Sequence, residues 1–396
     1  MPRVLWLLVI GMMVNVTGSS FLWPLNTIYI HDKLGKSLSV AGLVLMLNAA
    51  ATVVGNLSGG VLYDKIGGYR SILLGTIMTV LALAGLNIWH GWPHYVIFLA
   101  IIGLGTGMIM PSMYAMAGSV WKEGGRRAFN AVYIAQNVGV AVGSALGGFV
   151  ASLSFEYIFM ANLWMFVAFL FIAVFGYRHI SNQSIPQASS LKQPVPKRNK
   201  HKLIALLILC TAFLLCWVGY VQWMSTIASY TQDINISLKQ YGLLWTMNGA
   251  LIVLGQPIVS PVIKKSSLHL KGQIIVGIII FILSFIIAGA ADGFKGLAAA
   301  MIILTFGEMF VWPAVPTIAN QLAPKGREGF YQGIVNSTGT GGRMIGPLLG
   351  GILVDFYGMS MLFIVLIVLL VIAILLTIVF DRSLKESSNK KLSAST

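Results

Sequence analysis

The sequence predicts an all-α membrane protein with twelve transmembrane helices in two pseudo-symmetric six-helix bundles. Composition, the length of the apolar runs and an internal repeat carry this prediction. Hydrophobic residues make up 57% of the 396 positions and charged residues only 9%, which is more apolar surface than a soluble core can bury. The apolar runs are continuous rather than alternating, which favours membrane-spanning helices over a closed barrel.

Twelve apolar runs have about the length that a helix needs to cross a bilayer. They lie near residues 4–30, 40–62, 71–90, 94–120, 129–152, 157–178, 203–230, 240–263, 272–290, 296–320, 330–354 and 359–380. A stretch rich in proline and basic residues separates the sixth run from the seventh, and this composition is typical of a flexible linker. We therefore expect an N-terminal bundle over 1–178, a cytoplasmic linker over 179–202, a C-terminal bundle over 203–380 and a cytoplasmic tail over 381–396.

The basic residues indicate how the helices are oriented. If the N-terminus is cytoplasmic, most of the 26 Lys and Arg residues fall in cytoplasmic loops. The opposite loops hold only Lys33, Lys36, Lys239 and Lys295. This bias predicts a multi-pass protein of the cell membrane with both termini in the cytoplasm. These loops also account for the net charge of +15, so we expect the lipid bilayer, and no nucleic acid, as a partner.

The two halves of the sequence repeat one another. A shift of 200 aligns Asn48 with Asn248 and Gly55 with Gly255, and a shift of 202 aligns Gly105-Thr106 with Gly307-Glu308. A shift of 203 aligns two glycine series, Gly139, Gly143 and Gly147 with Gly342, Gly346 and Gly350. Such similarity indicates a transporter built from two related bundles, with its site near the midplane between them.

A short motif joins the second and third runs, Gly60-Val-Leu-Tyr-Asp64-Lys65-Ile-Gly67-Gly68-Tyr69-Arg70. Gly60 allows a close helix contact and Gly67 a tight turn. The segment resembles the signature loop of the major facilitator superfamily, G-x-x-x-D-[RK]-x-G-[RK]-[RK], although Gly68 and Tyr69 replace basic residues and Arg70 comes one position later. The resemblance implies the major facilitator fold. It also implies that Asp64, in a cluster with Lys65 and Arg70 at the cytoplasmic surface, latches the two halves together in the outward-open state.

The eleventh run contains a second motif, Gly342-Arg-Met-Ile-Gly346-Pro347-Leu-Leu-Gly350-Gly351. It is similar to the G-x-x-x-G-P-x-x-G-G pattern that drug/proton antiporters of the superfamily carry in helix 5. Helix 5 of this chain has the glycines of that pattern, but Ser144 replaces the proline. Spaced glycines let helices approach closely and proline bends a helix, which suits either a rocking interface or static packing. In the tenth run, Thr305-Phe-Gly307-Glu308 resembles a T-x-G-E segment of proton-coupled multidrug transporters.

Glu308 and Arg343 are the two charged residues expected near the middle of the membrane. Each lies about 12–13 residues into its run, or roughly 18–20 Å at ~1.5 Å per residue. A charge at that depth costs ~2.5–3.5 kcal/mol. Three interpretations are open: a proton-linked carboxylate with Arg343 as its partner, a permanent salt bridge, or an anion site in which Arg343 binds substrate and Glu308 positions it.

Other polar or aromatic residues within the runs are candidates for substrate binding. They are Asn15, Asn26, Gln136, Asn137, Tyr220, Trp223, Asn248 and Asn336. A pocket of aromatic and methionine side chains would suit amphipathic substrates of variable shape, and the chain has 18 Met and 10 Trp.

These residues and resemblances predict a secondary transporter that exports hydrophobic, often cationic compounds in exchange for protons, by alternating access. We expect a monomer that uses the proton gradient and needs no cofactor or metal, and we expect no enzymatic activity. The alternative is a proton-coupled symporter, or an exporter of a sugar, lipid or other small metabolite. A phosphate-binding loop of the form G-x-x-x-x-G-K-[ST] is absent from the sequence, which argues against an ATP-driven pump.

Overall fold

The computed structural model describes residues 1–22, 26, 29–36, 38–153, 155–178, 197–265, 269–382 and 384. Over this part of the chain all regular structure is helical. Ten of its helices are long and apolar enough to cross a membrane. The longest, α13 (Glu328–Val379), holds two spans, because Gly358 interrupts its helical geometry. With α10 (Leu238–Lys265), a further 28-residue helix, the described residues contain the twelve predicted spans.

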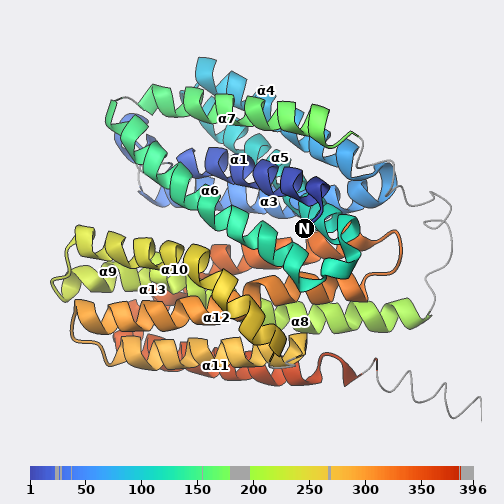
Figure 1. Cartoon of the computed structure of the whole chain (residues 1–396). Helices are drawn as coiled ribbons and strands as arrows, with labels where there is room; N and C mark the ends of the chain where they lie inside the picture. Colours follow the sequence, from blue (N-terminus) through green and yellow to red (C-terminus); the bar gives the residue numbers. More distant parts are fainter. Residues whose placement is uncertain are drawn as a thin grey trace, which may run out of the picture. The chain divides into compact units, whose positions relative to one another are not determined.

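The first compact unit comprises Met1–Lys192 and Lys325–Thr340. Its long helices are α1 (Arg3–Leu22), α3 (Leu38–Ile66), α4 (Gly68–Ile88), α5 (His94–Val120), α6 (Arg126–Leu153) and α7 (Phe155–Gly176). Helix α1 packs on α6 and α7, and both α3 and α4 pack on α5 (Figure 1). A short π-helix, Tyr29–Lys33, precedes α3, and a 3₁₀ turn, Lys122–Gly124, precedes α6.

The second compact unit comprises Gln193–Pro324 and Gly341–Thr396. Its helices are α8 (Lys197–Val221), α9 (Thr226–Asp233), α10, α11 (Leu270–Gly289), α12 (Phe294–Leu322) and the part of α13 that follows Thr340. Helix α12 packs on α8, α10 and α11, and Figure 1 shows α11 and α12 side by side. Helix α13 therefore contributes its first turns to one unit and the rest to the other.

Besides shifts of a few residues at helix ends, three differences from the predicted runs stand out. Helix α8 begins at Lys197, inside the segment predicted as linker, because lysine and arginine are good helix formers and no proline follows Pro196 there. The seventh run is not one helix: a 3₁₀ turn, Gln222–Met224, and non-helical backbone at Ser225 separate α8 from α9. The first run ends as an α-helix at Leu22, and Trp23 to Leu25 lie outside the described residues.

The two glycine series aligned by the repeat lie at equivalent helix contacts. In the first unit Gly139, Gly143 and Gly147 of α6 face α1; a Cβ on Gly139 would lie 2.8 Å from the carbonyl oxygen of Met13. In the second unit Gly342, Gly346 and Gly350 of α13 face α8 and the turn after it. The side-chain amide of Gln222 donates to the carbonyl of Gly346, one residue before Pro347, at 2.8 Å. Each series thus packs two helices of the same unit together.

Candidate functional site

Glu308 lies at the middle of α12 and is 1% exposed. Asn248 of α10 donates from its amide nitrogen to Glu308 Oε1 at 2.6 Å and to Thr305 Oγ1 at 2.9 Å. Thr305, one helical turn before Glu308, donates a hydrogen bond from its hydroxyl to the carbonyl of Met301 at 2.7 Å. The carboxylate is therefore held by a polar network that joins two helices, as a buried charge requires.

Tyr220 of α8 brings the two predicted intramembrane charges into one neighbourhood. Its hydroxyl hydrogen-bonds to Glu308, and it also interacts electrostatically with Arg343. Glu308 thus interacts with side chains of both α8 and α10. Of the predicted substrate-binding residues, the structure brings Tyr220 and Asn248 together at this carboxylate.

Aromatic side chains surround the charged residues. Trp217 of α8 and Trp312 of α12 stack in parallel, with ring centroids 4.7 Å apart and an interplanar angle of 6°. The guanidinium carbon of Arg343 lies 5.0 Å from the centroid of the Trp217 ring, within the range of a cation–π interaction. Sequence reasoning missed both tryptophans, although Trp217 stands three residues before Tyr220 and Trp312 four residues after Glu308, where one helix face is shared.

Asp64 at the end of α3 is 3% exposed and binds the start of α13. Its two carboxylate oxygens accept hydrogen bonds from the backbone N–H groups of Gly329 and Phe330, at 2.8 and 2.9 Å. The first four N–H groups of a helix lack partners within that helix, and a negative charge is favourable there. Asp64 therefore caps α13, within the first compact unit.

The glycines of the loop motif make this cap possible. A Cβ on Gly60 would lie 2.8 Å from the carbonyl carbon of Gly329, so only glycine lets the two backbones approach this closely. Gly67 has a φ of 86° and separates α3 from α4, which a residue with a side chain rarely tolerates. Lys65 and Arg70 are exposed.

The remaining predicted substrate-binding residues are dispersed. Asn26, Gln136, Asn137 and Asn336 each have a partner in the first unit, in turn Tyr95, Tyr114, the carbonyl of Tyr133 and the carbonyl of Gln332. Asn15 of α1 is 1% exposed, and neither polar atom of its amide has a hydrogen-bond partner. Trp223 is fully buried in the second unit. A role for these residues in binding substrate remains a prediction.

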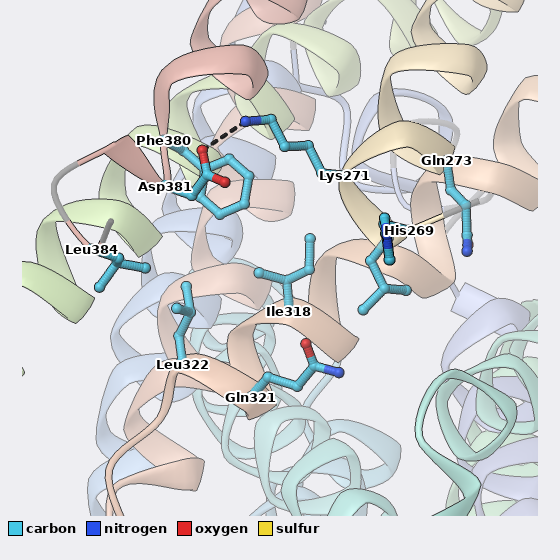
Figure 2. Close-up of a pocket in the computed structure, with 10 residues that line it drawn as sticks. His269, Lys271, Gln273, Ile318, Gln321, Leu322, Phe380, Asp381 and Leu384 are labelled. Atoms are coloured by element: carbon cyan, nitrogen blue, oxygen red, sulfur yellow. Dashed lines mark hydrogen bonds and ion pairs between the residues drawn. The ribbon is translucent and has the colours of Figure 1, made fainter. Parts of the chain in front are cut away.

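A cavity of about 500 Å³ lies elsewhere in the second unit, where α11 begins and α12 ends (Figure 2). Lys271 lines the cavity and donates hydrogen bonds to Asp381 Oδ1 and to the carbonyl of Ile378, each at 2.6 Å. Ile318 and Leu322 line the cavity. They lie 10 and 14 residues after Glu308, or roughly 15–20 Å further along α12 at ~1.5 Å per residue. This cavity is thus separate from the carboxylate network.

The arrangement of long apolar helices, a buried acid and a capped loop motif agrees with the outcome of comparison with known proteins. The family model described as Major Facilitator Superfamily matches residues 8–265 and 224–395. The chain belongs to the Major Facilitator Superfamily.

Two relatives and one solved structure illustrate the similarity. The chain is 59% identical over 398 residues to the uncharacterized MFS-type transporter YttB of Bacillus subtilis strain 168, which covers 100% of both chains. It is 26% identical to the quinolone resistance protein NorA of Staphylococcus aureus strain MRSA252, over 90% of this chain and 91% of that one. The crystal structure of the human organic anion transporter MFSD10 superposes with a TM-score of 0.73 at 16% identity, covering 95% and 100% of the two chains. As a member of this superfamily the protein is a multi-pass membrane transporter of the major facilitator fold.

Proposed function

We propose that this transporter exports hydrophobic, cationic compounds in exchange for protons, with Glu308 as the carboxylate that binds the proton. The observation that carries the proposal is the burial of Glu308 at the middle of α12, with hydrogen bonds from side chains of two other helices. A buried carboxylate in a membrane helix is costly and is found where protons or ions are handled. Its hydrogen bonds to α8 and α10 give protonation a direct mechanical consequence, because a neutral carboxyl group holds these donors less strongly.

In this mechanism a proton and a cationic substrate compete for the same carboxylate. Binding of either one changes the contacts of α12 with α8 and α10 and biases the alternation between inward- and outward-facing states. The similarity to NorA, named for quinolone resistance, supports a drug as the substrate. The positive charge of Arg343 near Tyr220 offsets part of the cost of a buried carboxylate when no proton is bound.

The test is transport of ethidium, a cationic dye, into liposomes that contain the purified full-length protein and an acidic lumen. We expect the wild-type protein to accumulate ethidium against its gradient and the Glu308→Gln protein to lose this accumulation while keeping its fold. The control is Glu123→Gln, which removes an exposed acid from the loop before α6. Accumulation by Glu308→Gln at the wild-type level would show that the proton is handled elsewhere.

A double substitution separates a proton switch from a static salt bridge. We expect Arg343→Ala alone to impair transport, because it leaves negative charge less compensated within the helices. The Glu308→Gln/Arg343→Ala protein should remain uncoupled from protons even if its fold is restored. Recovery of proton-driven accumulation in the double variant would instead assign a purely structural role to both residues.

A further inference from the structure

A wall of aromatic rings lies beside Glu308 in the second unit. Phe213, Trp217 and Tyr220 project from one face of α8, at spacings of four and three residues. Phe213 and Tyr220 both stand edge-on to the Trp217/Trp312 stack, at interplanar angles of 82–83°. Trp245 of α10 also stands edge-on to Tyr220, with a centroid distance of 6.1 Å. Because the rings pack against one another, they hold Trp217, and the guanidinium that contacts it, in a fixed position.

Arg343 covers the outer face of this wall. Trp312 occupies one face of the Trp217 ring at 4.7 Å, too close to admit a guanidinium between the two rings. The cation at 5.0 Å must therefore lie on the opposite face of Trp217. Unlike Glu308, Arg343 is exposed. A guanidinium that rests on an aromatic face keeps its N–H edge in the plane of the group, where it can bind a carboxylate through two parallel hydrogen bonds.

Trp217 adds an unused hydrogen-bond donor to the same place. Its ring is half-buried, and its indole N–H is shielded from water and has no hydrogen-bond partner among the described residues. A buried donor of this kind costs free energy unless it finds an acceptor. An acceptor on a bound molecule would meet this need.

We propose that the site takes zwitterions, with Arg343 binding the carboxylate and Glu308 facing the cationic end. The inference rests on the proposed function, which it narrows from cations in general to cations that also carry a carboxylate. A partner for Glu308 alone would be expected to be buried with it. The exposure of Arg343 and its position on the outer face of Trp217 fit a group that meets a ligand.

The test compares two dyes that differ only in the group that Arg343 would bind. Rhodamine B carries a free carboxylate, and its methyl ester is the same aromatic cation without it. Binding to the full-length protein in detergent is measured by fluorescence anisotropy. We expect the wild-type protein to bind the acid about tenfold more tightly than the ester, the size of effect typical of a hydrogen-bonded charge. Equal affinities for the two dyes, or no binding of either, would overturn the proposal.

Substitutions then assign the preference to this arginine. Arg343→Gln should reduce the acid-to-ester ratio to about one, mainly by weakening binding of the acid. Arg343→Lys keeps the positive charge but loses the planar guanidinium that binds a carboxylate through two hydrogen bonds, so it should retain only part of the preference for the acid. It replaces Arg343→Gln in the experiment if that variant does not fold. The matched control is Arg382→Gln, which removes an exposed positive charge beyond the end of α13 and should leave the ratio unchanged. An unchanged ratio in both Arg343 variants would overturn the assignment.

Transport of the same dyes separates this inference from the proposed function. If a pH gradient drives neither dye but the wild-type protein still binds the acid preferentially through Arg343, the proposed proton exchange fails and the binding site stands. If a pH gradient drives both dyes equally and Arg343→Gln changes nothing, proton-driven export stands and the zwitterion site fails.

Discussion

Asn48 of α3 and Asn248 of α10 are equivalent positions of the internal repeat, yet they have different partners. Asn248 donates to two side chains of α12, Thr305 and Glu308. Asn48 donates to a backbone carbonyl of α5, that of Leu99, at 2.6 Å. The same amide in the same scaffold therefore supports a polar network in one unit and plain helix packing in the other.

The residues that face these amides explain the difference. The repeat places Gly103 where the second unit has Thr305, and Thr106 where it has Glu308. A Cβ on Gly103 would lie 2.6 Å from the amide nitrogen of Asn48, so α5 approaches α3 too closely for a side chain at that point. Thr106 turns its hydroxyl back to the carbonyl of Ile102 at 2.8 Å. The two asparagines differ in their partners because glycine replaces Thr305, and threonine replaces Glu308, in the first unit.

Glycines also make the first unit the more tightly packed of the two at this contact. A Cβ on Gly55 would clash with the carbonyl oxygen of Leu104 and lie 3.0 Å from Cα of Gly107, both of which are backbone atoms. At the equivalent Gly255 the nearest atom is the terminal methyl of Met309, at 3.0 Å. A methionine side chain can move aside and a helix backbone cannot. The contact of α10 with α12 at Gly255 thus involves a group that can rearrange.

The largest effect is expected when an acid is added at the equivalent position of the first unit. Thr106→Glu should sharply reduce the yield of folded protein, because the amide of Asn48 is already bonded to the carbonyl of Leu99 and an unsupported carboxylate within the membrane costs ~2.5–3.5 kcal/mol. Yield is measured by size-exclusion chromatography in detergent, with Thr106→Val as the uncharged control, expected near the wild-type value. A Thr106→Glu protein that folds normally would mean that the two units are chemically interchangeable.

Substituting each asparagine in turn compares how much its hydrogen bonds contribute to stability and to transport. Asn248→Ala removes a hydrogen bond to a buried acid and should lower the free energy of unfolding by about 1.5–3 kcal/mol. Asn48→Ala removes one hydrogen bond to a carbonyl and should lower it by about 0.5–1.5 kcal/mol. Thermal unfolding in detergent reports the difference in stability. Proton-driven ethidium transport should fall in Asn248→Ala and persist in Asn48→Ala. Equal loss of transport in both would remove the functional distinction between the units.

A methyl group added at each equivalent glycine probes the packing. Gly55→Ala should destabilise the protein by about 1–3 kcal/mol, because the added methyl group would clash with the backbone of α5, which cannot move aside. Gly255→Ala should have a smaller effect, because the Met309 methyl can shift. The midpoints of thermal unfolding give the order, and a larger loss at Gly255 would contradict the packing difference.

The smallest effect is expected at Asp64, the buried acid of the first unit. Asp64→Ala removes a helix cap and should lower the free energy of unfolding by about 0.5–2 kcal/mol. Asp64→Asn keeps an oxygen acceptor and should lower it by less. Hydrogen exchange should accelerate at the start of α13, where Gly329 and Phe330 lose their acceptor. The dependence of transport on the imposed pH gradient should keep its shape in both variants. A loss of proton coupling at Asp64 would place an essential acid in each unit.

Sequence patterns predicted the helices well and their interruptions poorly. Each of the twelve runs is mainly helical over the described residues, because a continuous apolar stretch of that length has few other ways to satisfy its backbone in lipid. The 3₁₀ turn at Gln222–Met224 lies inside the seventh run and has no marker in hydropathy. Gln222 instead serves the contact with α13, donating to Gly346 and accepting from Thr226.

The loop motif shows the same limit at the predicted latch residue. The sequence singled out Asp64, but it did not indicate that the acid is buried or that its partners are N–H groups of α13. The two sites lie 265 residues apart in the chain, and backbone N–H groups leave no trace in a sequence. Only the close contact between Gly60 and Gly329 shows why this acid and that helix end meet.

The sequence alone determined the membrane class, the repeat and the two charges that stand out within it. These follow from local quantities, the apolar length of a run and the cost of a charge inside it. The tertiary structure decided which neighbours give the charges their chemistry: Asn248 and Tyr220 for Glu308, and Trp217 for Arg343. Such neighbours depend on how far each helix is rotated about its axis and how closely it approaches the next, and hydropathy does not encode either quantity.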